Sequence, residues 1–302
     1  MAKALICGAG GFVGGHCLQA FRSQGWFTVA ANRGAAVADA SVGVGVVGDF
    51  MDREFVREAL RAYSFERIVF AAGPADVQQS FADPVADFRQ QALPLLNVLE
   101  ESRLLSRPPG VLLVSSAAVY GNPAANPVSE ETLARPISPY GFHKLHQEML
   151  LDEYAALYNL PTAKARVFST FGPGLRHLAV WDITNRALRG QNQLWGTGGE
   201  SRDYLHVIDV ASALEHVART SAFKGEVVNI ASGRETAIAQ LAAIIFDEMG
   251  LTAPPVFDGS QLSGSPARWR ADVSRLADLG FAPQVALERG LRETVRWIRQ
   301  HA

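Results

Sequence analysis

The sequence is poor in cysteine and in long apolar segments, and its charges nearly cancel. It has 302 residues, two cysteines and a formal net charge of -2. Cys7 and Cys17 have no zinc-ligand spacing and form no disulfide framework, so we expect buried, reduced thiols and no metal site. The charge balance indicates neither nucleic acid nor an anionic membrane as a partner. Since no apolar run approaches the roughly twenty residues of a membrane helix, we expect a cytoplasmic globular protein.

The first half of the sequence alternates strand-like apolar runs with helical patterns. We expect strands at Ala4–Cys7, Phe27–Ala31, Val42–Val47, Arg67–Ala71, Val111–Val114 and Thr162–Phe168. This βα alternation predicts an α/β fold with a doubly wound parallel (Rossmann) sheet. Ligands of such sheets bind beyond the carboxyl ends of the strands.

The second half is less regular and predicts a smaller interleaved lobe. After Phe171 we expect strands at Val227–Ile230 and Val256–Phe257 and a closing amphipathic helix over Leu287–Gln300. The predicted division is a dinucleotide-binding Rossmann domain over 1–171, to which 205–230 returns, and a substrate-binding lobe over 172–204 and 231–302.

A glycine-rich turn follows the first predicted strand and opens a helical pattern. Gly8 can make the tight turn, Gly11 lets the backbone approach a pyrophosphate, and Gly14 lets the helix pack close to the strand. The helix N-terminus then presents free N–H groups to the phosphates. A turn that packs a helix on a strand without any ligand is the alternative.

Tyr140 and Lys144 are spaced i to i+4, which puts both on one face of a helix. An adjacent ammonium favours the phenolate, so the pair predicts an acid-base group. Ser116, at a strand end, can hydrogen-bond the phenol or a substrate oxygen. The alternative is a solvated helix face and a turn serine. Without a third ligand nearby, His143 and His146 are interpreted as helix-surface groups rather than a metal site.

Several segments occur in a fixed order along nearly the whole chain. They are Gly-x-x-Gly-x-x-Gly from Gly8 to Gly14, Gly48-Asp49, Ser115-Ser116-Ala-Ala-Val-Tyr-Gly121, Ser138-Pro-Tyr-Gly-Phe-His-Lys144, Arg166-Val-Phe-Ser-Thr-Phe-Gly-Pro-Gly174, and Gly196-Thr-Gly with Arg202-Asp-Tyr-Leu-His-Val-Ile-Asp-Val210. In this order the chain resembles extended short-chain dehydrogenases/reductases of the nucleotide-sugar epimerase, dehydratase and reductase group. The resemblance implies a nucleotide-sugar substrate and a homodimer packed through the helix that bears Tyr140.

The resemblance also implies roles for single residues. Tyr140 would exchange a proton with the sugar, Lys144 would hold the nicotinamide ribose and lower the tyrosine pKa, and Ser116 would hydrogen-bond the reacting oxygen. Asp49 would meet the adenine, and Arg202 would lie near the nucleotide diphosphate. The implied cofactor site comprises Gly8, Gly11, Phe12, Val13, Gly14, Arg33, Asp49, Phe50, Ala71, Ala72, Gly73, Tyr140 and Lys144. The implied substrate site comprises Ser169, Arg176, Arg202 and Arg268.

Residues that depart from the pattern of this group narrow the choice of reaction and of cofactor. Ala117-Ala118 stand where dehydratases carry Asp-Glu, so dehydration is not expected. The second strand ends in Asn32-Arg33 rather than in the acid that binds a ribose 2′-OH. An arginine suits a 2′-phosphate, which favours NADP while leaving NAD possible. The alternative is that Arg33 is a solvated turn residue.

Two further departures concern the substrate. Ser169 replaces the asparagine that helps to hold a diphosphate in the group, and 261–266 replaces an expected Arg-x-Gly-Asp, which leaves Arg268 as the nearest arginine. The identity of the nucleotide therefore stays open. A 4-epimerase and a 4-keto-sugar reductase are both compatible with the sequence. A non-catalytic NADP-binding sensor is the alternative of another class, although such relatives usually lose Tyr140 and Lys144.

Overall fold

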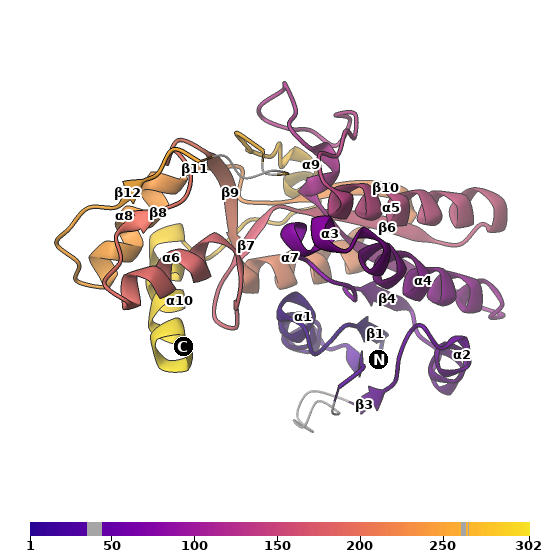
Figure 1. The fold of residues 1–302 in the computed structure, drawn as a ribbon. Coiled ribbons are helices and arrows are strands. Elements are labelled where there is room, and N and C mark those ends of the chain that lie inside the picture. The colour runs from indigo at the N-terminus through magenta and orange to yellow at the C-terminus, as the bar shows by residue number, and fades with distance from the viewer. Residues whose placement is uncertain (35–43, 261–263, 265) are drawn as a thin grey trace.

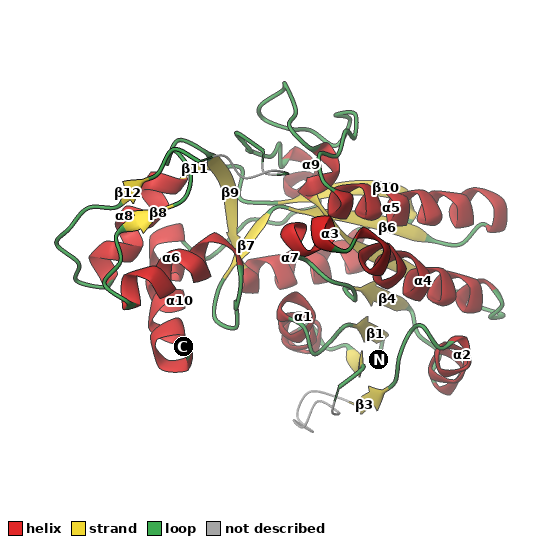
Figure 2. Ribbon diagram, in the orientation of Figure 1, coloured by secondary structure: helices red, strands yellow, loops and turns green. Residues whose placement is uncertain are grey.

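The computed structural model describes residues 1–34, 44–260, 264 and 266–302, and its centre is a seven-stranded sheet (Figures 1 and 2). The strand order is β3-β2-β1-β4-β5-β6-β10, and all neighbours are parallel. The strands are β1 (Lys3–Cys7), β2 (Phe27–Asn32), β3 (Val44–Val47), β4 (Arg67–Phe70), β5 (Gly110–Ser116), β6 (Thr162–Val167) and β10 (Lys224–Ile230). The predicted doubly wound parallel sheet is therefore confirmed. Its order reverses between β1 and β4, and this is where such sheets bind ligands.

Helices cover both faces of this sheet because both faces are apolar. Along β1, Ala4 and Ile6 pack toward α1 (Phe12–Ser23) and α7 (Val207–Thr220). The alternate residues Leu5 and Cys7 pack toward the other layer. That layer consists of α2 (Arg53–Ala62), α4 (Pro84–Arg103) and α5 (Pro139–Tyr158) (Figure 1). In the described part of the chain, no helix is both long enough and apolar enough to cross a membrane.

A smaller lobe with its own core lies beside the large sheet. It contains a three-stranded sheet of β11 (Glu235–Ala237), β9 (Ser201–His206) and β7 (Ser169–Phe171), and a pair formed by β8 (Gln193–Leu194) and β12 (Val256–Phe257). Its helices are α6 (Leu178–Leu188), α8 (Ile238–Glu248) and α10 (Leu287–His301). The short elements α3 (Val77–Ala82), η2 (Ala117–Tyr120) and α9 (Ser274–Asp278) complete the chain.

The structure refines several expected boundaries. Strand β6 ends at Val167 rather than at Phe168, because the chain then turns to pair Ser169–Phe171 with β9 in the small sheet. Val256–Phe257 is a strand as predicted, but it pairs with β8. Of the strand predicted over 42–47, residues 42 and 43 lie outside the described residues. The division into two domains stays a prediction.

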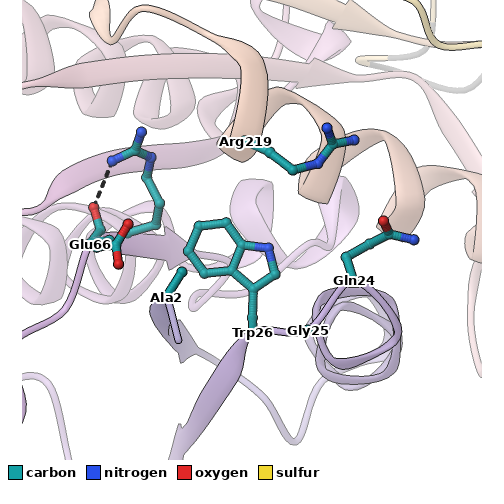
Figure 3. A pocket seen from close by; sticks show the side chains of 7 residues that line it. Ala2, Gln24, Gly25, Trp26, Glu66 and Arg219 are labelled. Carbon is teal, nitrogen blue, oxygen red and sulfur yellow. Dashed lines mark hydrogen bonds between the residues drawn. The ribbon is translucent and has the colours of Figure 1, made fainter.

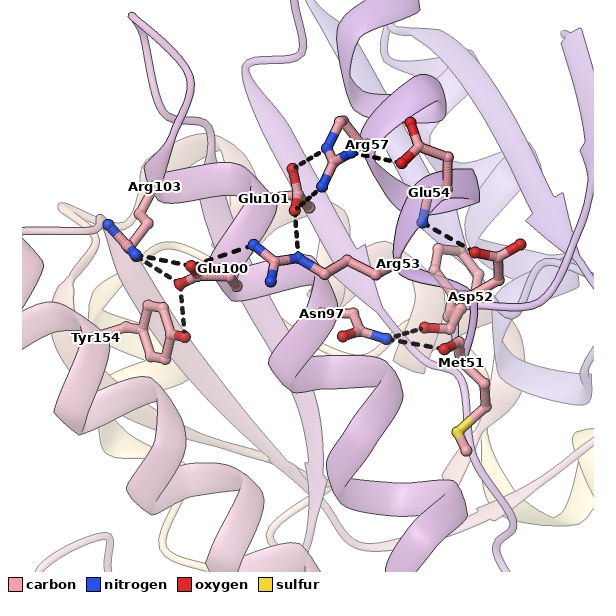
Figure 4. Close-up of polar contacts among 11 residues, drawn as sticks. Met51, Asp52, Arg53, Glu54, Arg57, Asn97, Glu100, Glu101, Arg103 and Tyr154 are labelled. Atoms are coloured by element: carbon pink, nitrogen blue, oxygen red, sulfur yellow. Dashed lines mark hydrogen bonds and ion pairs between the residues drawn. The ribbon is translucent and has the colours of Figure 1, made fainter.

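Ion pairs tie the outer layer of helices together (Figure 4). Arg53 on α2 donates its Nε hydrogen to Glu101 of α4 over 2.5 Å. Glu100, the neighbouring residue on α4, accepts a hydrogen bond of 3.0 Å from the hydroxyl of Tyr154 on α5. Both α2 and α5 are thereby fixed to α4. Cys7 and Cys17 are fully buried free thiols, as predicted.

Candidate active site

The glycine turn after β1 is shaped by close approaches that only glycine allows. Gly8 has a φ of +82°, and a Cβ there would lie 2.8 Å from the carbonyl oxygen of Ala71. A Cβ at Gly14 would lie 2.2 Å from the carbonyl oxygen of Gly8. The Gly8 N–H donates to Ala31 O over 2.9 Å. The turn is therefore held between the ends of β2 and β4. It lies next to the point between β1 and β4 at which the strand order reverses.

The N-terminus of α1 is built to receive an anion. Its N-cap is Gly11, which supplies no capping side chain, and the first turn contains no acidic residue. The first N–H groups of this helix are thus left for a ligand, with the positive end of the helix dipole behind them. A Cβ at Gly11 would approach Gly8 O to 3.2 Å and would fill part of this cradle. The residues fit the pyrophosphate of a dinucleotide, with Phe12 and Val13 in the first turn.

The loop after β3 is held rigidly near this turn. Asp49 accepts the Met51 N–H over 2.9 Å. Asn97 of α4 donates to the carbonyl oxygens of Phe50 and Met51 over 2.9 and 3.2 Å (Figure 4). Sequence reasoning missed Asn97, because its role depends on a contact between distant segments. The contact of Asp49 with adenine stays a prediction.

The ends of β2 and β4 place the other predicted cofactor residues. Arg33 is exposed directly after β2, and Asn32 ends that strand with its side chain beside Gly10. Ala71, Ala72 and Gly73 follow β4. These residues thus lie at carboxyl strand ends, as the sequence predicted. Their contacts with a cofactor stay predictions.

Helix α5 brings Tyr140 to Ser116. Ser138 caps the helix by accepting the Gly141 N–H over 3.1 Å, and the Tyr140 N–H donates to the Ser80 hydroxyl over 3.0 Å. Tyr140 is buried, and its side chain lies close enough to that of Ser116 for the serine to lower its pKa. The predicted phenol and serine therefore meet beyond the end of β5. Sequence reasoning missed Ser80.

Burial is the largest influence on the ionisation of Tyr140. It raises the pKa of this phenol to about 12, and Ser116 opposes that rise. Burial also lowers the pKa of Lys144 to about 8. Lys144 Nζ lies 5.9 Å from the centroid of the Tyr140 ring, and it donates to Val114 O and Gln147 Oε1 over 3.3 and 3.0 Å. The lowering of the Tyr140 pKa by the Lys144 ammonium stays a prediction.

The interpretation of both histidines as helix-surface groups is wrong for His143. Its ring is buried, and Nδ1 lies 2.5 Å from Asp87 Oδ2 on α4. His146 is exposed, as predicted. Asp87 is 56 residues earlier in the chain, so local spacing could not reveal this pair. Within the described ranges, no group of three or more potential metal ligands gathers.

The predicted substrate residues fall into two places. Ser169 on β7 is in register with Tyr204 on β9, next to Arg202 and Ser201 in the same strand. Ser201 is bridged to Arg268. Arg176 is placed elsewhere, since its guanidinium lies 5.5 Å from the ring centroid of Trp297 on α10.

The two neighbouring arginines differ in their surroundings. The Arg202 guanidinium lies 5.6 Å from the ring centroid of Trp269, and burial lowers its pKa. Arg268 is exposed and donates two hydrogen bonds of 2.7 and 3.0 Å to Glu235. Arg268 and the Ser201 hydroxyl together lower the pKa of Glu235 to about 2. Arg202 is therefore a largely buried cation, whereas Arg268 is an exposed one paired with Glu235.

A separate hollow lies at the amino ends of the strands of the large sheet, opposite the glycine turn (Figure 3). It has a volume of about 240 Å³, and its lining includes Trp26, Arg67 and Arg219. Trp26 precedes β2, and Arg67 begins β4, so this hollow faces the amino ends of the parallel strands. It is therefore not part of the candidate active site.

Known proteins are similar to this chain in sequence and in fold. A model of the NAD dependent epimerase/dehydratase family matches residues 4–231. A putative UDP-glucose 4-epimerase of Methanocaldococcus jannaschii is 27% identical over 98% of this chain and 98% of its own length. The structure of the UDP-glucose 4-epimerase of Thermotoga maritima with UDP-glucose is similar, with a TM-score of 0.89, 26% identity and 99% of each chain covered.

A second solved structure carries a cofactor. The UDP-glucose 4-epimerase of Thermus thermophilus, in complex with NAD, has a TM-score of 0.87 and 26% identity, with 99% of this chain and 100% of the other covered. The family match covers most of the chain, including the glycine turn, Ser116, Tyr140 and Lys144. The chain therefore belongs to the NAD dependent epimerase/dehydratase family.

Proposed function

We propose that this chain is a nicotinamide-dinucleotide-dependent enzyme that acts at a ring carbon of a nucleotide-activated sugar, as a 4-epimerase. The observation that carries the proposal is the meeting of Tyr140 and Ser116 at the carboxyl edge of the sheet that also bears the glycine cradle. Relatives over the full length of the chain are UDP-glucose 4-epimerases, which supports both the sugar and the reaction.

Each side chain of the site has its own role in the proposed reaction. In its phenolate form, Tyr140 would accept the proton of the sugar hydroxyl while a hydride leaves the same carbon, which would leave a ketone. Return of that hydride to the opposite face, with the proton from Tyr140, would give the epimeric alcohol. A dinucleotide held at the glycine cradle would supply the hydride acceptor and donor. Ser116 donates a hydrogen bond to the reacting oxygen, and the Lys144 ammonium orients the ribose.

Elimination of water is not part of the proposed reaction. Ala117 and Ala118, the residues after Ser116, are apolar members of η2, and Ala117 is fully buried. Neither side chain can accept or donate a proton. We therefore expect this site to leave the hydroxyl groups next to the reacting carbon in place.

The end of β2 supports a second candidate, a 4-keto-sugar reductase that uses NADPH. Asn32 stands where an acid would bind the ribose 2′-OH, and the exposed Arg33 suits a 2′-phosphate. The related structure from Thermus thermophilus holds NAD. Arg33 is the feature of this chain that favours NADP instead. Arg33→Ala should lower affinity for NADP about tenfold and leave that for NAD unchanged. An unchanged preference removes Arg33 from the proposal.

A substrate panel separates the candidates. Purified protein is mixed with each dinucleotide and with UDP-hexoses or nucleotide 4-keto-6-deoxy sugars. Interconversion of UDP-hexoses without net change in cofactor absorbance supports the epimerase. Stoichiometric loss of NADPH absorbance with a keto sugar supports the reductase instead. If no sugar reacts and Tyr140→Phe retains full biological activity, the chain is a non-catalytic dinucleotide-binding protein.

A homodimer through α4 and α5 is part of the proposal. Apolar side chains of these helices stay exposed, among them Val85, Phe88, Phe142 and Met149. Exposed apolar patches of this kind mark protein interfaces. Light scattering should give twice the chain mass, and Phe142→Glu should reduce it to the monomer mass.

A further inference from the structure

A buried acid–histidine pair joins α4 to α5, the helix that carries the catalytic groups. His143 follows Tyr140 by three residues and directly precedes Lys144. Its Nδ1 lies 2.5 Å from Asp87 Oδ2, and the two residues are 9% and 4% exposed. An ionised carboxylate only accepts hydrogen bonds, so Nδ1 carries the hydrogen. A carboxylate is thus kept out of water next to two groups whose protonation the reaction uses.

We propose that Asp87 and His143 are a positioning pair that sets the charge around Tyr140 and Lys144, and with it the pH range in which the enzyme works. The inference rests on the proposed function in assigning proton transfer to Tyr140. His143 ties α5 to α4 at the level of the reacting groups.

Another carboxylate, Glu148, also raises the pKa of Lys144, and it is paired with an arginine. Glu148, one turn beyond Lys144, accepts hydrogen bonds from Arg166 Nη2 and Nε over 2.7 and 3.0 Å. Elements α3 and β5 contribute no titratable side chain. The titratable groups on or capping the packed elements are Asp76 at α3, Asp83, Asp87, Arg89, Glu100, Glu101 and Arg103 at α4, Tyr140, His143, Lys144, His146, Glu148, Asp152, Glu153, Tyr154 and Tyr158 on α5, Tyr120 on η2, Lys164 and Arg166 on β6, and Lys224 and Glu226 on β10.

The direction of the effect follows from electrostatics. Burial is the largest cause of the shifts at both catalytic groups, since it raises the pKa of Tyr140 and lowers that of Lys144. The Asp87 charge raises the pKa of each, because a nearby negative charge favours the protonated form. Removing that charge must therefore lower both pKa values together.

The first test is the pH–rate profile of Asp87→Asn. We expect both limbs of the profile to move to lower pH, by about one unit. His143→Gln keeps the carboxylate, so its profile should not move to lower pH. The control is Glu153→Gln, which removes an exposed carboxylate from the same helix and should leave the profile in place. A reduced kcat with an unmoved profile in Asp87→Asn makes the pair a packing contact and overturns the proposal.

A second test needs no turnover. The phenolate absorbance of the protein minus that of its Tyr140→Phe variant reports the ionisation of Tyr140 alone. With Asp87→Asn in both members of the comparison, the midpoint should fall; an equal midpoint contradicts the proposal even if no sugar substrate is found. If Asp87→Asn does not fold, the double variant Asp87→Asn/His143→Gln, which can keep an amide–amide hydrogen bond, takes its place in both measurements.

Discussion

Gly141 lies so close to Ala118 that a Cβ on the glycine would sit 2.7 Å from the alanine carbonyl oxygen. This contact joins the first turn of α5 to η2, the segment directly after Ser116. The distance between Tyr140 and Ser116 therefore depends on this close backbone approach.

Gly141→Ala should separate the two reacting groups. Because misplacement by about 1 Å can cost a hundredfold in rate, we expect kcat to fall at least about tenfold. Overpacking should lower the free energy of unfolding by about 1–3 kcal/mol. Gly15→Ala on α1 is the matched control, since its Cβ would meet Ala9 O at an ordinary 3.4 Å. Steady-state kinetics and urea unfolding measure both effects, and an unchanged kcat would show that the contact is irrelevant to catalysis.

Two glycines of the cradle should respond differently to alanine. Gly14→Ala would place a Cβ 2.2 Å from Gly8 O, so it should lower both thermal stability and dinucleotide affinity. Gly11→Ala approaches the same oxygen to 3.2 Å, so it should keep most of the stability. It should still weaken dinucleotide binding by about tenfold, because it occupies space at the helix N-terminus. Fluorescence titration and thermal melting separate the two, and equal losses in both variants would contradict the assignment.

Lys144 should make stability increase with pH. Burial lowers its pKa from 10.5 to about 8. Between these values the unfolded chain binds more protons than the folded one, so unfolding becomes less favourable as pH rises. The free energy of unfolding of the protein relative to Lys144→Met should rise by on the order of 3 kcal/mol from pH 8 to pH 10.5. Denaturant titrations across this window test it, and a constant difference would mean that the lysine stays charged without cost.

Arg202 and Arg268 should contribute unequally to substrate binding. Arg202 is desolvated beside Trp269, whereas Arg268 is exposed and paired with Glu235. Charge-assisted hydrogen bonds in a desolvated site are the stronger ones. Arg202→Ala should raise KM for the nucleotide sugar by about tenfold or more, and Arg268→Ala by about two- to threefold. A larger effect at Arg268 would place the diphosphate at that arginine instead.

The elements that could be predicted are those whose structure is determined by residues close together in the sequence. Strands such as β1 and β5 are apolar on both faces, so they read as short hydrophobic runs between glycine, proline or charged residues. The glycine turn is largely local, because Gly8 has a positive φ and a Cβ at Gly11 or Gly14 would approach Gly8 O. The i to i+4 spacing of Tyr140 and Lys144 likewise places both residues on one face of α5, as predicted.

The parts that escaped prediction arise between distant segments. His143 looked like a surface residue because the carboxylate that accepts its hydrogen bond is on another helix. The sign of the Tyr140 shift depended on burial, which no spacing reports. The turn of Ser169 into the small sheet required a partner strand some thirty residues later.

The path of the chain between its two sheets limits how such a protein can change. The chain leaves the large sheet after Val167, enters the small one at Ser169, and returns to the large one at Lys224 by way of β9 and α7. It then enters the small sheet again at Glu235. The small lobe is thus not a cassette that recombination could exchange at one junction. New sugar specificities in this architecture should arise through point substitutions at the lining strands rather than by shuffling of whole lobes.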